Sequence, residues 1–159
     1  MTDFEALYQQ YAQDIFRFAF FLSGNRADAE DIASETFVRV WNAPGGIRQS
    51  TVKAYLLVIA RNYYLQGLRR SARNSPLEQD LADPRQAPHD CAEQRAELEQ
   101  VMRDLQQLPE VDRAALLLSA VEEMSYEQIA ETLGLSLGAV KTKIHRARLK
   151  LEQARSQRR

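Results

Sequence analysis

The chain has 159 residues, a length that allows one medium domain or two small ones. Its apolar content of 45% is normal for a globular protein, and its net charge of −1 is low for a protein that binds nucleic acid. It has no run of about eighteen apolar residues that would span a membrane, its N-terminus is too polar for a signal peptide, and the single cysteine, Cys91, excludes an internal disulfide framework. We therefore expect a cytoplasmic protein without membrane insertion.

Charge is unevenly distributed along the chain. Residues 96–124 contain two Lys or Arg and seven Asp or Glu, a net charge of −5. Residues 125–159 contain eight Lys or Arg and three Asp or Glu, a net charge of +5. Residues 1–70 carry +1 and residues 71–95 carry −2. A basic end beside an acidic segment makes a polarised molecule, and the low average charge hides a surface suited to an anionic partner.

Three helices are predicted in the first half, from apolar residues that recur at helical spacing. They run over about residues 3–23, 27–41 and 52–70. Turn signals rich in Gly, Asn and Pro separate them. In the second helix, Phe37 and Trp41 are among the residues predicted to face inward.

A flexible linker is predicted over residues 71–95, where three prolines fall among polar residues without apolar periodicity. Helix is expected to resume near Ala92 and to break at Pro109, a residue suited to open the next helix. The predicted fold class is all-α, with two small helical domains, 1–70 and 96–159, on either side of the linker. Each domain is near the lower size limit for an independent core.

The most specific pattern, SYEQIAETLGLSLGAVKTKIHRAR over residues 125–148, predicts a helix-turn-helix. Ala130 is small enough for a steep helix crossing, Gly134 tolerates the positive φ of a sharp turn, and Ser136 is placed to cap the second helix. The residues expected to face inward in that helix are Leu137, Val140, Ile144, Ala147 and Leu151. Its outer face is cationic, which suits a DNA major groove. An ordinary amphipathic hairpin with a solvated charged face is the less specific alternative.

Both halves together resemble an extracytoplasmic-function (ECF) RNA polymerase sigma factor of the sigma-70 superfamily, the minimal bacterial type with regions two and four. In the first half the resemblance rests on residues 29–32, 35–41, 54–56, 59–62 and 68–70. In the second it rests on residues 108–110, 116–118, 125–130, 133–134, 138–141 and 145–148. It implies that residues 1–70 are region two, which binds core polymerase and the minus-ten element. Residues 96–159 would be region four, which binds the minus-thirty-five element.

The resemblance also implies partners and contact residues. The partners are core RNA polymerase, through its β′ coiled coil and β flap, promoter DNA and an anti-sigma factor. Polymerase binding falls on Glu30, Asp31, Ser34, Glu35 and Arg39, although the family often has Gln where this chain has Ser34. Minus-ten binding falls on Ile47, Arg48, Gln49, Ser50, Arg61, Asn62, Arg69 and Arg70. Minus-thirty-five binding falls on Ser125, Tyr126, Lys141, Thr142, Lys143, His145, Arg146 and Arg148.

Other function classes are less well supported. An enzyme is not expected, because neither His89 nor His145 neighbours a nucleophile in a packed site, and His89 with Cys91 falls short of a zinc ligand set. We predict no catalytic residue, metal site or cofactor. A stand-alone helix-turn-helix transcriptional regulator is the main alternative, and a protein-binding adaptor is the second. The N-terminal sensing domain of such a regulator would not need the motifs at 35–41 and 59–62, so their presence favours the sigma factor.

Overall fold

The computed structural model describes residues 3–43, 51–71 and 92–158, and all regular secondary structure in these ranges is α-helical. The helices are α1 (Asp3–Ser23), α2 (Arg26–Asn42), α3 (Val52–Ser71), α4 (Ala92–Gln106), α5 (Glu110–Ala120), α6 (Tyr126–Leu133) and α7 (Leu137–Gln157). The all-α prediction is confirmed. The predicted minus-ten residues Ile47, Arg48, Gln49 and Ser50 and most of the linker lie outside the described residues. In the described part of the chain, no helix is long and apolar enough to cross a membrane.

The turn between α6 and α7 follows the residues that predicted it. Gly134 takes a φ of 67° and ends α6, and the Ser136 side chain accepts a hydrogen bond of 3.1 Å from the Ala139 backbone N–H at the start of α7. At the other end of α6, Ser125 and Gln128 form a reciprocal capping box. The helix-turn-helix is therefore held by local hydrogen bonds at the start of each of its two helices.

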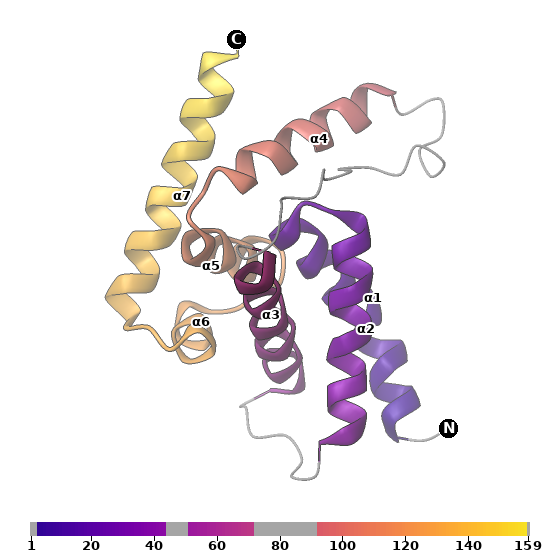
Figure 1. Ribbon diagram of the computed structural model, residues 1–159. Coiled ribbons are helices and arrows are strands. Elements are labelled where there is room, and N and C mark those ends of the chain that lie inside the picture. The colour runs from indigo at the N-terminus through magenta and orange to yellow at the C-terminus, as the bar shows by residue number, and fades with distance from the viewer. Residues whose placement is uncertain (1–2, 44–50, 72–91, 159) are drawn as a thin grey trace.

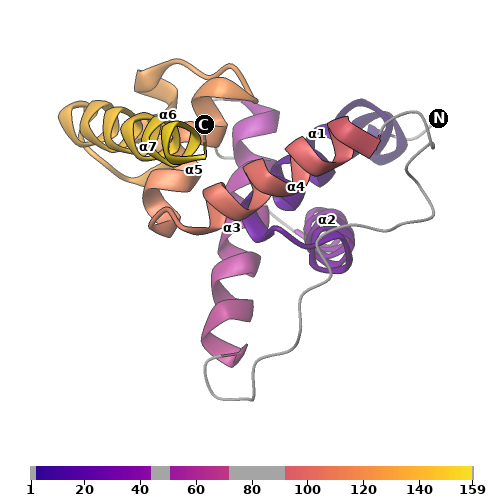
Figure 2. The ribbon, with the colours of Figure 1, turned by 90° about the horizontal axis from the view of Figure 1, so that it is seen from above.

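The helices form two groups that pack against each other (Figures 1 and 2). In the first group α1 lies along α2, and α3 packs on both, while in the second group α5 packs on α6 and α7. Contacts of α1 with α4 and α5, and of α3 with α6, join the groups. Both views place α2 and α7 on opposite sides of the molecule.

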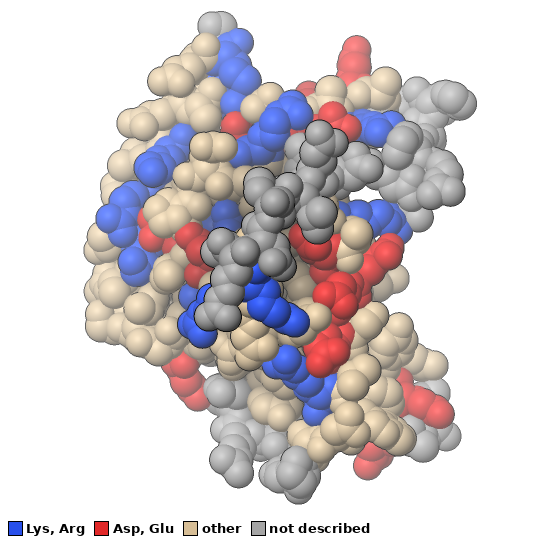
Figure 3. Space-filling model, viewed as in Figure 1, with Lys and Arg blue, Asp and Glu red and all other residues tan. Residues whose placement is uncertain are grey.

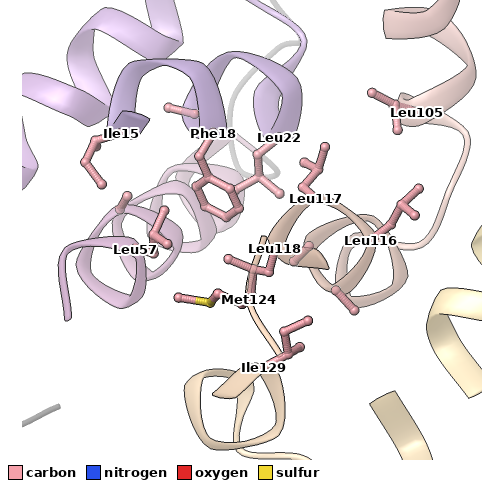
Figure 4. Close-up of a cluster of buried hydrophobic side chains, with 14 of the residues drawn as sticks. Ile15, Phe18, Leu22, Leu57, Leu105, Leu116, Leu117, Leu118, Met124 and Ile129 are labelled. Atoms are coloured by element: carbon pink, nitrogen blue, oxygen red, sulfur yellow. The ribbon is translucent and has the colours of Figure 1, made fainter. Parts of the chain in front are cut away.

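One hydrophobic core runs through both groups. Phe18 of α1 and Leu57 of α3 lie close to Leu117 and Leu118 of α5, and each of the four is at most 3% exposed (Figure 4). Two small helical halves that are individually near the lower limit for a stable core thus bury apolar surface against each other. In the described conformation the halves are packed together, an arrangement that the sequence had not indicated.

Two residues predicted to face inward are exposed. Trp41 is 64% exposed, because Phe37 occupies the interior position one turn earlier and the Trp41 ring packs edge-on against Phe4 at the end of the groove between α1 and α2. Leu137 is 37% exposed, because it stands at the first position of α7, before Val140 begins the buried face. Both predictions were wrong at helix ends, where periodicity continues but the neighbouring helix does not.

Candidate polymerase-binding and DNA-binding surfaces

The acidic surface of α2 contains the five residues expected to bind polymerase. Glu30, Asp31 and Ser34 are exposed, whereas Glu35 and Arg39 are half-buried. The Arg39 Nε donates to Glu35 at 3.2 Å, one helical turn away. Figure 3 shows acidic side chains gathered over this helix. The structure therefore places all five residues on one accessible face.

Contacts with α3 hold this acidic surface in place. The Tyr63 hydroxyl donates a 2.8 Å hydrogen bond to the Asp31 carboxylate, and that bond raises the pKa of Tyr63 above its usual value. The Arg39 guanidinium lies 5.0 Å from the centre of the Tyr63 ring and donates to the Gln66 side chain at 3.1 Å. Asp31 and Arg39 are thus fixed from the neighbouring helix.

An apolar groove of about 570 Å³ adjoins the acidic surface between α1 and α2. The residues that line it are Phe4, Glu5, Tyr8, Ser34, Phe37, Val38 and Trp41. Tyr8 and Val38 are each 50% exposed, so the groove has a wide mouth. Sequence reasoning missed it because aromatic residues at helical spacing usually indicate core.

The candidate minus-ten residues of α3 lie in two different environments. Arg61 is held by Glu110 of α5, with Nε–Oε1 and Nη2–Oε2 distances of 2.7 and 2.8 Å. Asn62 is exposed and borders a small pocket that includes Thr132 of α6. Arg69 and Arg70, at the end of α3, are exposed. The packing of the halves therefore engages Arg61 and leaves the last turn of the helix accessible.

Further polar contacts cross between the halves. The side chain of Glu122, between α5 and α6, is fully buried and pairs with Arg17 of α1 and Lys53 of α3, both at 3.2 Å. The buried Arg113 of α5 donates to the hydroxyl of Tyr64 at 3.0 Å, and burial raises the pKa of that tyrosine. Sequence reasoning missed these partners, because they lie 49 or more positions apart in the chain and no local pattern connects them.

The candidate minus-thirty-five residues lie mainly on the outer face of α7. Lys141, Thr142, His145 and Arg148 are exposed, and Arg146 is 52% exposed. The remaining three are less prominent. Ser125 is exposed but uses its hydroxyl in the α6 cap, Tyr126 is half-buried, and the Lys143 side chain is 24% exposed. The inner face of α7, with Val140, Ile144 and Ala147, is buried as predicted.

Comparison with protein families agrees with this arrangement of helices. The model for sigma-70 region 2 matches residues 7–74, and the model for sigma-70 region 4 matches residues 98–151. Among curated proteins, the ECF RNA polymerase sigma factor SigE of Mycolicibacterium smegmatis is 36% identical over 160 residues, which cover 95% of this chain and 61% of that protein. The RNA polymerase sigma factor YlaC of Bacillus subtilis is 32% identical over 158 residues, which cover 94% of this chain and 90% of YlaC.

Solved structures share the fold. The sigma factor RpoE of Bartonella quintana, in complex with the anti-sigma factor NepR, has a TM-score of 0.81 at 23% identity, and the match covers 98% of both chains. CnrH, in complex with the cytosolic domain of CnrY, has a TM-score of 0.69 at 26% identity, with 94% of this chain and 85% of that chain covered.

Regions two and four of sigma-70 in one all-helical chain define a sigma factor. The chain belongs to the ECF RNA polymerase sigma factors, a family that is not known as enzymatic and that includes SigL of Mycobacterium tuberculosis, which is 34% identical over 89% of this chain and 82% of SigL. It is therefore a factor that directs RNA polymerase to promoters, and the alternative of a stand-alone transcriptional regulator is not favoured.

Proposed function

We propose that this sigma factor binds core RNA polymerase in the cytoplasm through the acidic surface of α2, and through its second half at the β flap. In our proposal α3 and the loop before it handle the minus-ten element, and α7 enters the major groove at the minus-thirty-five element. The observation that carries the proposal is the separation of an exposed acidic helix face from an exposed basic one on opposite sides of a single body.

The roles on α7 follow from side-chain chemistry. Arginine and lysine donate to guanine O6 and N7, so Arg146 and Lys141 are suited to base edges, and Thr142 is suited to a thymine methyl or a base edge. Lys143 and Arg148 are suited to phosphates, which fix position and carry no sequence information. His145 is exposed between these groups and suits the groove wall.

The polymerase contact combines two kinds of surface. Glu30, Asp31 and Glu35 suit a basic partner, and such charges mainly set orientation and association rate. The adjoining groove with Val38 and Trp41 supplies apolar area that charges alone lack. The β′ coiled coil that the family resemblance implies would then contact both surfaces.

Binding of the minus-ten element requires the halves to separate at α3. Glu110 takes two donors of Arg61 in the bidentate manner of a phosphate, and the Arg61 side chain is only 17% exposed, so DNA would have to displace Glu110 to form the same pair. In our proposal the holoenzyme exchanges the carboxylate for DNA. An anti-sigma factor is the expected antagonist, since the sigma factor RpoE, which shares this fold, was crystallised with one.

Run-off transcription tests this function. Core polymerase with the purified protein should start RNA at a promoter that neither initiates alone, and Asp31→Arg should lower the yield by weakening core binding. Asp3→Arg, an exposed carboxylate at the start of α1, is the matched control for charge. A stand-alone regulator would act only when another sigma factor is present. A protein-binding adaptor would bind promoter DNA equally well after Lys141→Ala and Arg146→Ala.

A further inference from the structure

A buried carboxylate lies beneath the basic face of α7. Asp112 of α5 is 1% exposed, yet its two oxygens point to cations of the recognition helix. Its Oδ2 accepts a 3.0 Å hydrogen bond from the Arg146 Nε, and its Oδ1 lies 3.6 Å from the Lys143 Nζ. A buried carboxylate is costly without partners, so this pair of cations explains why Asp112 is tolerated in the interior.

The atom that Asp112 contacts on Arg146 decides how the guanidinium is presented. The hydrogen bond uses Nε, at the base of the planar group, and the side chain as a whole remains 52% exposed. The two terminal Nη groups are the donors that form a bidentate pair with guanine O6 and N7. A contact at Nε therefore restrains the guanidinium and leaves both terminal Nη groups unused by Asp112.

We propose that Asp112 is a positioning residue for promoter recognition, which holds Arg146 by its Nε so that the terminal fork faces a base pair of the minus-thirty-five element. This inference rests on the base-reading role proposed for Arg146. The gain is preorganisation. A free arginine side chain loses rotational freedom about several bonds when it binds DNA, whereas an arginine already held by Asp112 has less freedom to lose. Lys143, on the same carboxylate, is fixed beside it.

A simpler effect of Asp112 must be separated from positioning. A carboxylate near DNA also lowers the positive charge of α7, and its removal on those grounds would tighten binding to every DNA sequence equally. Positioning instead affects discrimination at a single base pair. Glu127, an exposed carboxylate of α6, provides a charge-matched control, because Glu127→Gln removes one negative charge from the same half of the molecule.

The experiment uses holoenzyme and a library of promoters randomised in the minus-thirty-five element. Wild type, Arg146→Ala, Asp112→Asn, Asp112→Ala, Glu127→Gln and the double variant Asp112→Ala/Arg146→Ala are compared by bound-sequence selection. Arg146→Ala should identify the base pair that Arg146 reads, with a loss of preference of about tenfold or more. Both Asp112 variants should lose about fivefold at that same base pair, and neither should lose more in the Arg146→Ala background. Thermal melting confirms that each variant is folded.

The outcomes separate the two proposals. If Arg146→Ala leaves every base preference unchanged, the base-reading role of Arg146 fails, and positioning by Asp112 fails with it. If Arg146→Ala relaxes one position while the folded Asp112 variants keep it intact, base reading stands and the positioning role is overturned. A uniform rise in affinity in the Asp112 variants that matches Glu127→Gln also overturns it, in favour of charge neutralisation.

Discussion

The two candidate DNA-binding helices each contain an arginine paired with a carboxylate of α5, and the pairs differ in what they leave accessible. Arg61 of α3 gives two donors to Glu110 in the other half of the molecule, and its side chain is 17% exposed. Arg146 of α7 gives one donor to Asp112 within its own half and is 52% exposed. The first pair keeps most of its arginine buried against the other half, and the second leaves about half of its arginine side chain exposed.

Both pairs join an arginine to a carboxylate of α5, so the difference in exposure comes from the packing around them. Through the shared core, α5 and α6 pack against α1 and α3. In the described part of the chain, no helix packs on the outer face of α7. Under the proposed function, α7 could therefore reach the minus-thirty-five element while the halves are packed together, whereas minus-ten binding by Arg61 would require the halves to separate.

The largest expected effect is loss of the shared core. Phe18→Ala should lower the free energy of unfolding by about 3–5 kcal/mol, because it leaves a cavity where α1, α3 and α5 meet. Urea unfolding followed by far-UV circular dichroism and by fluorescence of Trp41, the single tryptophan, measures it. Leu98→Ala, at a leucine that is 43% exposed, is the control and should cost less than about 0.5 kcal/mol. Two separate wild-type transitions would contradict a common core.

The next effect tests the pair between Arg61 and Glu110, which joins the two halves. Glu110→Gln should weaken the packing of the two halves by about 1–3 kcal/mol, since glutamine has no charge and offers Arg61 only one acceptor oxygen in place of two. The free protein should then bind single-stranded minus-ten DNA about 5- to 150-fold more tightly, because a larger fraction of the molecules has its two halves separated. Glu99→Gln removes a carboxylate paired within α4 and should change nothing. Equal affinities of wild type and Glu110→Gln would show that the Glu110 pair does not limit access.

A smaller effect distinguishes phosphate contacts from base contacts on α7. Arg148→Ala should weaken holoenzyme binding to all promoter sequences by a similar factor and lower the slope of log affinity against log salt by about one. Lys141→Ala should instead relax the preference at one base pair. Filter-binding titrations at several salt concentrations measure both, and a sequence-dependent loss in Arg148→Ala would reassign that residue.

The smallest effect concerns the turn that positions α7. Ser136→Ala removes the 3.1 Å cap on the Ala139 N–H and should cost about 1 kcal/mol, or a few degrees in Tm. Ser156→Ala, at an exposed position near the end of the same helix, should leave Tm within about one degree. Equal melting temperatures for both variants would mean that tertiary packing alone holds the start of α7.

Local features were predictable because short-range forces decide them. The helices, the positive φ of Gly134, the Ser136 cap and the buried inner face of α7 follow from spacing, side-chain size and neighbouring hydrogen-bond groups. The exposed acidic face of α2 and the basic face of α7 follow from the same periodicity. Trp41 and Leu137 were the failures, since burial at a helix end depends on how far the neighbouring helix extends.

The sequence by itself thus determined the helices, their capping and the motifs on which the resemblance to a sigma factor rests. The tertiary structure alone decided which charged residues are exposed to a partner and which are paired inside the protein. Glu110, Asp112 and Glu122 look like ordinary acidic residues in the sequence, and their roles come from arginine and lysine partners 31 or more positions away. Such pairing depends on how two marginal cores bury their apolar surface together, and no local pattern carries that information.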